Sequence, residues 1–129
     1  MPQHLSLTAI VVRDYDEAVA FFVDQLGFEL REDSRLGDEK RWIVVAPPGS
    51  AESGILLAKA VTPRQEQAIG DQSGGRVFLF LATDDFDRDY QAFRKRGVKF
   101  LEEPWRERYG MVAVFEDLYG NRWDLIERR

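Results

Sequence analysis

The chain contains no cysteine, a single histidine and no long hydrophobic run. The absence of cysteine excludes disulfides, thiolate nucleophiles and cysteine-ligated zinc. Because His4 is the only imidazole, neither a Ser-His-acid triad nor a Cys-His pair can be assembled. No apolar run approaches the ~20 residues that cross a bilayer, and no basic flank, apolar region and cleavage site mark a leader. We therefore expect a soluble, cytoplasmic protein without these nucleophiles.

Basic residues are in the minority, with 18 lysines and arginines against 23 aspartates and glutamates and a net charge of −5. Nucleic acids and anionic membranes require a concentrated basic face, so neither is expected as a partner. The glycines form no phosphate-binding loop, because Gly74 and Gly75 precede a strand rather than a helix, and there is no flavin or nicotinamide fingerprint. The sequence therefore predicts no cofactor.

An internal repeat is the most informative feature that is present. From residue 7 to 27 the chain reads apolar strand, Asp14, amphipathic helix and Gly27. Residues 78–97 repeat this order, with Asp85 as the helix cap, Gly97 as the terminator and a helix that is one residue shorter. Aspartate favours a helix start and glycine a helix end. A repeat of this length indicates a structural half rather than a solenoid unit.

Three further strands follow the helix in each half, so that both halves read βαβββ. The 129 residues, 44% hydrophobic and 32% charged, suit one globular domain spanning 1–129. We place the halves at about 1–60 and 76–129, joined by a polar link at 61–75 with little hydrophobic patterning. The expected strands are 5–12, 28–34, 41–47 and 54–60, then 77–82, 98–102, 111–116 and 122–127, around helices at 14–27 and 85–97.

Several short motifs resemble the vicinal oxygen chelate superfamily, which includes glyoxalase I, extradiol dioxygenases, and fosfomycin and bleomycin resistance proteins. The resemblance covers essentially the whole chain in order and spacing. It implies an α+β fold of paired βαβββ modules that form a cleft-shaped, partly open mixed sheet with helices packed outside. One fold hosts many chemistries, so function must be argued from the site. The motifs are Val12-x-Asp14, Phe21-Phe22 and Leu26-Gly27-Phe28, then Asp84-Asp85-Phe86-Asp87, Arg96-Gly97-Val98, Tyr109-Gly110 and Asp117-x-x-Gly120-Asn121.

The resemblance also implies where metal ligands would stand, on the first and last strand of each half. Alignment on the capping aspartates gives Leu7 and Phe78, and alignment of the last strands gives Leu57 and Asp124. Divalent transition metals need imidazole, carboxylate or thiolate donors, and three of these four side chains are hydrocarbon. His4 lies three residues before Leu7, about 10 Å away in an extended strand and on its other face. We expect no catalytic metal.

Asp124 is the one polar member of this set. Alternation along its strand directs Trp123 and Leu125 toward the helices and Asp124 toward the cleft. A carboxylate among apolar walls either pairs with an arginine or has its pKa raised by desolvation. Two interpretations stay open: an acceptor or weak general base for a ligand's amine or hydroxyl, or a structural ion pair with Arg41 or Arg106.

The same alternation supplies the other candidates for ligand contact. Aromatic walls with a few polar groups suit a planar or amphipathic small molecule, although aromatic residues at such spacing also form cores. Arg106 is either an anion clamp or a solvated side chain. Val11 belongs to the expected cleft face, and Trp105 lies near its mouth. The candidate ligand-binding residues are Leu7, Ala9, Trp42, Leu57, Phe78, Phe80, Arg106, Tyr109 and Asp124, and Asp124 is the candidate catalytic residue.

Three hypotheses remain for function. The first is a metal-independent binder of a small aromatic or amphipathic molecule, of the bleomycin-resistance type. The second is a glyoxalase-like lyase or isomerase that uses Asp124 or an unrecognised metal site. The third is a structural or partner-binding module. Proteins resembling this one commonly pair as two-fold homodimers, sometimes by exchanging halves, and the sequence leaves both arrangements open.

Overall fold

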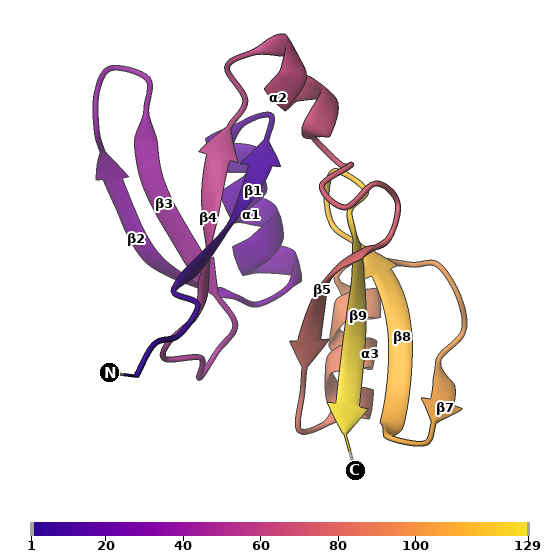
Figure 1. Cartoon of the computed structure of the whole chain (residues 1–129). Coiled ribbons are helices and arrows are strands. Elements are labelled where there is room, and N and C mark those ends of the chain that lie inside the picture. The colour runs from indigo at the N-terminus through magenta and orange to yellow at the C-terminus, as the bar shows by residue number, and fades with distance from the viewer. Residues whose placement is uncertain (1, 129) are drawn as a thin grey trace. The chain divides into compact units, whose positions relative to one another are not determined.

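The computed structural model describes residues 2–128 and divides into two compact units, Met1–Ile69 and Gly70–Arg129. The boundary falls inside the polar stretch 61–75. The first unit contains β1 (Leu7–Val12), α1 (Tyr15–Ala20), the π-helical turn η1 (Phe21–Gln25), β2 (Glu29–Arg35), β3 (Arg41–Ala46), β4 (Gly54–Lys59) and α2 (Pro63–Ala68) (Figure 1). The predicted βαβββ order is therefore present in this unit.

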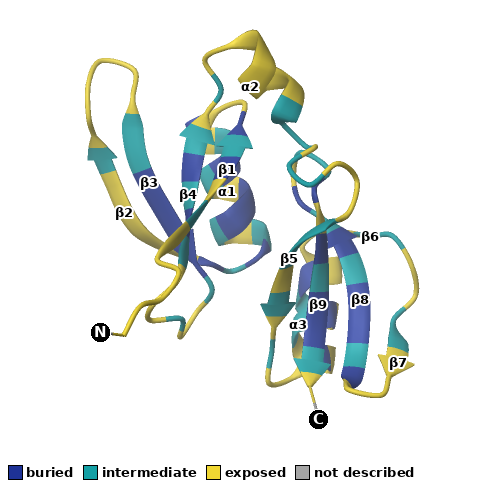
Figure 2. Ribbon diagram, viewed as in Figure 1, coloured by how far each residue is buried: buried dark blue, intermediate teal, exposed yellow. Residues whose placement is uncertain are grey.

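The sheet of the first unit has the strand order β1-β4-β3-β2. β1 and β4 run parallel, and the other neighbours are antiparallel. α1 covers one face of this sheet. In β1 and β4 the buried residues are two positions apart and face α1, whereas in β3 residues 43–46 are all buried (Figure 2). The sheet thus has a second face on the side away from α1 (Figure 1). The side chains buried toward α1 are Ile10, Val12, Ile43, Val45, Ile55 and Leu57.

A single inserted residue explains why the first helix is longer than its repeat. Asp14 caps α1, its Oδ2 accepting a hydrogen bond from the Glu17 amide at 2.9 Å. After Ala20 the backbone widens into η1, where the Leu26 amide donates to the Phe21 carbonyl five residues earlier at 3.1 Å. A π turn holds one more residue than an α turn. The extra residue inferred from the spacing is thus accommodated within η1.

The polar stretch 61–75 contains α2, which the hydrophobic pattern did not predict. Thr62 Oγ1 accepts from the Gln65 amide at 3.1 Å, and Gln65 Oε1 accepts from the Val61 amide at 2.8 Å. These two hydrogen bonds, with Pro63 at the first helical position, fix the start of the helix. None of the α2 residues is buried, so the helix has no apolar stripe. Its signal lies in the cap and not in periodicity.

The second unit repeats the first with one added strand. It contains β5 (Val77–Ala82), α3 (Phe86–Lys95), β6 (Lys99–Phe100), β7 (Trp105–Glu107), β8 (Gly110–Glu116) and β9 (Arg122–Arg128). The sheet order is β5-β9-β8-β6, with β7 paired to β8. The strand expected at 98–102 is limited to β6, and β7 was not predicted because only three residues pair there.

Aromatic rings fill the space between this sheet and α3. Phe115 stacks on Trp123 with ring centroids 5.7 Å apart, and Phe93 meets Phe115 edge-on at 5.5 Å. Trp123 is 2% exposed, as expected for a core residue. Its indole Nε1 donates to Asp117 Oδ2 at 3.1 Å, so the indole's one polar atom is satisfied. The core of this unit is thus a sheet-to-helix aromatic layer.

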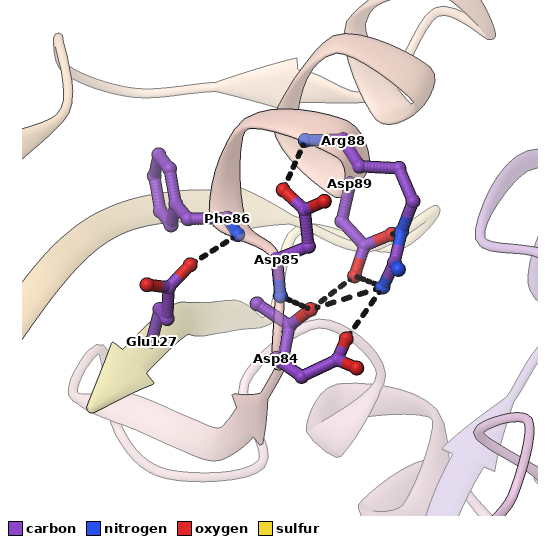
Figure 3. A network of polar contacts seen from close by, with 7 residues as sticks. Asp84, Asp85, Phe86, Arg88, Asp89 and Glu127 are labelled. Carbon is purple, nitrogen blue, oxygen red and sulfur yellow. Dashed lines mark hydrogen bonds and ion pairs between the residues drawn. The ribbon is translucent and has the colours of Figure 1, made fainter. Parts of the chain in front are cut away.

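Charged side chains fix the start of α3, as Figure 3 shows. Asp85 caps the helix by accepting from the Arg88 amide at 3.1 Å, and Glu127 of β9 accepts from the Phe86 amide at 2.6 Å. Arg88 donates to Asp84 and Asp89. Burial raises the pKa of Asp89, but hydrogen bonds from Arg88 and Thr83 outweigh it and lower that pKa. The first turn of α3 is therefore fixed to the sheet by carboxylates.

Candidate functional site

Asp124 lies on the sheet face of the second unit that is opposite α3. Across the parallel pair its partner is Phe80 of β5, and across the antiparallel pair its partner is Val114 of β8. Register partners point to the same face. Phe80 is 66% exposed, so a large apolar ring stands beside this carboxylate with little cover. The next pair on this face, Val112 and Ile126, is apolar as well.

The carboxylate of Asp124 lacks a compensating partner. Its Oδ1 is buried and accepts no hydrogen bond from any residue in 2–128. Burial raises the pKa of Asp124. Withdrawing a carboxylate from water without a donor disfavours its charged form, which is the physical cause of that rise. A donor that a bound molecule brought to Oδ1 would supply the hydrogen bond that this acceptor lacks.

Within residues 2–128, Asp124 forms no ion pair with either arginine that the sequence suggested. Arg41 lies in the other unit and donates to Asp33 at 2.7 Å and to Asp16 at 2.9 Å. Arg106 of β7 is the register partner of Met111 of β8, and Met111 is in turn the register partner of Glu127 of β9. The Glu127 side chain accepts a hydrogen bond from the Phe86 amide at the start of α3, so it lies on the α3 face. Its register therefore directs Arg106 to the face opposite Asp124. Trp105, one residue earlier, has the parity of the Asp124 face.

Two other candidates of the second unit are not register partners of Asp124. Phe78 falls at a bulge between Val77 and Leu79 and has no register partner in β9. A bulge interrupts the alternation on which the placement of Phe78 depended. Tyr109 is 41% exposed in the turn between β7 and β8. Of the expected set, the structure brings together Phe80 and Asp124.

In the first unit the side chains of β1 point to the predicted faces of the sheet, whereas those of β4 point to the opposite faces. Leu7 and Ala9 are exposed and Val11 is half-buried, on the face away from α1. Leu57 is fully buried, and its register partner is Ile10 of the core. The last-strand alignment was thus one residue out of register, which turns a strand residue to the other face. Leu56, the partner of Ala9, takes the open position instead.

The second unit contains a cavity of about 430 Å³, and the first unit contains one of about 710 Å³. The larger lies where β1 and β4 end, between the β2–β3 turn and α2. Trp42, Leu56 and Ala58 supply its apolar wall from the open face of the sheet. The turn and the strand end add charged side chains at its rim. Its remaining lining is Val11, Tyr15, Glu39, Lys40, Arg41, Lys59, Ala60, Val61 and Gln65, together with Leu57, a predicted ligand-binding residue.

The donor set does not fit a catalytic transition metal. Within residues 2–128, no three His, Cys, Asp or Glu side chains lie close enough to hold an ion. The aligned positions contribute the hydrocarbons of Leu7 and Phe78, and the open position of β4 contributes Leu56. Asp124 alone offers oxygen, whereas such ions require three or four donors.

In the part of the chain that is described, no helix has the length and apolar character to cross a membrane.

These observations define an α+β protein of two βαβββ modules, each with an open mixed sheet covered by helix on one face. The chain belongs to the Glyoxalase/Bleomycin resistance protein/Dioxygenase superfamily, whose sequence profile matches residues 4–125. The resemblance inferred from the motifs is therefore confirmed, as is the fold class. Membership does not choose among the activities that the superfamily name combines.

One relative and two crystal structures are similar to this chain over nearly its whole length. An uncharacterized protein of Shewanella frigidimarina is 54% identical over 128 residues, covering 98% of this chain and 95% of its own. The crystal structure of UcmS2 superposes with a TM-score of 0.85 at 32% identity and 98% coverage of both chains. TnmS3, an antibiotic binding protein from Streptomyces sp. CB03234, superposes with a TM-score of 0.79 at 31% identity, over 99% of this chain and 98% of its own.

Proposed function

We propose that this protein binds a small aromatic or amphipathic molecule on the open, mainly apolar faces of its sheets, without a catalytic metal. The observation that carries the proposal is the buried, unpartnered Oδ1 of Asp124 beside the exposed ring of Phe80. An apolar surface with one convergent polar group is typical of a small-molecule site. Similarity to an antibiotic binding protein supports the same class of ligand.

Asp124 supplies the polar anchor in this proposal. A ligand amine or hydroxyl that donates to Oδ1 would satisfy an acceptor that is otherwise desolvated without compensation. Phe80 and Val114 would meet the apolar part of the same ligand. The second unit therefore favours a ligand that combines an aromatic surface with a hydrogen-bond donor.

Calorimetric titration with a matched pair of ligands tests this assignment. 2-(Aminomethyl)naphthalene and 2-methylnaphthalene share a ring system, and only the first carries a donor. We expect the amine to bind more tightly by about tenfold, the scale of one charge-assisted hydrogen bond. Asp124→Asn should remove most of that preference, whereas Asp38→Asn, in the exposed β2–β3 turn, should leave it intact. Equal affinities in the wild-type chain would contradict the anchor.

The raised pKa of Asp124 also favours a second candidate, a lyase or isomerase with Asp124 as general base. A base works best when its pKa approaches the working pH, and burial moves this carboxyl in that direction. Turnover of a hemithioacetal by metal-stripped protein, lost in Asp124→Asn, would establish this activity. Turnover that Asp124→Asn leaves unchanged, or none at all, would remove it.

A further inference from the structure

The cavity of the first unit is distinct in charge from the rest of the chain. Lys40 and Lys59 lie at its rim, and neither ammonium has an ion-pair partner in the described part of the molecule. Arg41 also lines it, but that guanidinium is held by Asp33 and Asp16. Glu39 is the single lining carboxylate. Two uncommitted cations thus face one carboxylate, although the whole chain has a net charge of −5.

An aromatic wall lies below this cationic rim. Trp42 is half-buried at the start of β3, and Leu56 and Ala58 of β4 share the cavity with it. An indole flanked by aliphatic side chains accepts a flat ring by stacking and by burial of apolar area. The volume of about 710 Å³ is in the range of drug-sized ligand sites. The first unit therefore presents an aromatic ring and cationic side chains to the same cavity.

The borders of the cavity are fixed by hydrogen bonds. The Arg41 amide donates to the Tyr15 hydroxyl at 3.3 Å, and the Arg41 guanidinium lies 5.3 Å from the centre of the Tyr15 ring. On the other side, Gln65 accepts from the Val61 amide at 2.8 Å. Both walls are thus shaped before a ligand arrives, which lowers the entropic cost of binding.

From these features we infer that the cavity lined by Trp42, Lys40 and Lys59 is a binding site for a planar aromatic acid. The ring stacks on Trp42, and the carboxylate or sulfonate of the ligand faces the two ammonium groups. The inference rests on the proposed function in taking the ligand to be a small aromatic molecule. It differs in placing an anionic group in the first unit, independently of Asp124 in the second.

Titration with 2-naphthoate and its neutral isostere 2-naphthamide tests the inference. We expect the acid to bind more tightly, with each of Lys40→Gln and Lys59→Gln costing up to about fivefold, the ceiling for an exposed ion pair. The double variant should bind acid and amide equally. Lys95→Gln, at the exposed end of α3, changes the net charge by the same amount and should keep the preference. Added salt should weaken only the acid.

The indole signals of the three tryptophans locate the ligand in a nitrogen–proton correlation spectrum. The Trp42 signal, assigned by its loss in Trp42→Phe, should shift with naphthoate, while the signal of buried Trp123 should not. A preference for the amide, or acid binding that leaves the Trp42 signal unmoved, would overturn the inference. The proposed function would survive that result, because its own test uses the amine ligand and Asp124. If both tests failed, neither the proposed function nor this inference would stand.

Discussion

Phe80 and Asp124 are register partners on the adjacent parallel strands β5 and β9, so an exposed phenyl ring and a poorly solvated carboxylate share one sheet face. The carboxylate Oδ1 has no hydrogen-bond partner among the described residues. Natural proteins rarely leave a buried polar atom unsatisfied, and those that do often hold it for a ligand or for chemistry. A stability cost at Asp124 should therefore accompany its proposed role in binding.

Asp124→Asn should stabilise the unliganded protein at neutral pH. The substitution keeps the shape of the side chain and removes a charge that burial disfavours. We expect the free energy of unfolding to rise by about 1 kcal/mol, the low end of the cost of an uncompensated buried polar group. Urea unfolding of both proteins measures the difference. A variant less stable than the wild-type chain would show that the carboxylate has a partner.

The pH dependence of that gain has a definite sign. Because the pKa of Asp124 is raised in the folded state, the folded protein holds this proton more tightly than the unfolded chain. The contribution of Asp124 to folding stability is therefore fully present below its ordinary pKa of 3.8. This contribution is lost as the pH rises through the raised pKa of the folded state. Asp124→Asn should give its advantage at pH 7 and almost none below that window. An advantage that grows toward acid pH would contradict the assignment.

Asp117→Ala should be strongly destabilising. Asp117 is 5% exposed and accepts from the Trp123 indole, from the Asn121 side chain, and from the amides of Tyr119 and Asn121. Its removal leaves these donors unsatisfied in the β8–β9 turn, at a cost of about 3 kcal/mol or more. Urea unfolding measures the loss. Asp38→Ala in the exposed β2–β3 turn is the control, and a similar effect of both would disprove the role of the network.

Gly70→Ala should cost more than Gly74→Ala, although both glycines have positive φ. The φ angles are 77° and 66°, so left-handed strain of about 1–2 kcal/mol is common to the two substitutions. A Cβ at Gly70 would lie 2.1 Å from the Tyr119 carbonyl oxygen, whereas a Cβ at Gly74 would meet nothing within 4 Å. Overpacking should add about 1–3 kcal/mol at Gly70. Equal melting temperatures of the two variants would show that residue 70 does not lie close to Tyr119.

Deletion of Asp24 should be tolerated better than deletion of Gln91. Asp24 is exposed within η1, and its removal returns a π turn to an α turn with the flanking residues in place. Gln91 lies in the regular helix α3, where a deletion rotates later residues by about 100° and displaces the buried Phe93. We expect the second deletion to cost over about 3 kcal/mol. Thermal unfolding ranks the two variants, and the reverse order would contradict the insertion.

The sequence predicted the two modules because their signals are local. Aspartate caps, glycine terminators and apolar alternation recur in each half, and Asp14, Asp85 and Gly97 have the roles expected of them. The extra residue of the first helix was visible in the spacing, but the spacing did not indicate that it forms a π turn. Helix α2 was missed since its signal is the cap of Thr62 and Gln65, with no apolar stripe.

The candidate site was predictable only where strand parity was marked by contrasting residues. In β9, Asp124 stands between Trp123 and Leu125, so the face of each was evident and the parity is confirmed by register. In β4, Leu56 and Leu57 are chemically equivalent, and only pairing with β1 distinguishes them. Lys40 and Lys59 gave no signal either, because a turn and a strand end meet at the cavity only after folding.

The central claim, ligand binding without a metal, is tested most directly by the melting temperature of chelator-treated protein with aromatic and amphipathic compounds. Binding to the folded state alone stabilises by mass action, by about 2.7 kcal/mol at a ligand concentration of 100 times Kd. The account predicts that at least one compound raises the melting temperature with no divalent ion present. If no compound does so, or if every increase requires an added metal ion, the account is contradicted.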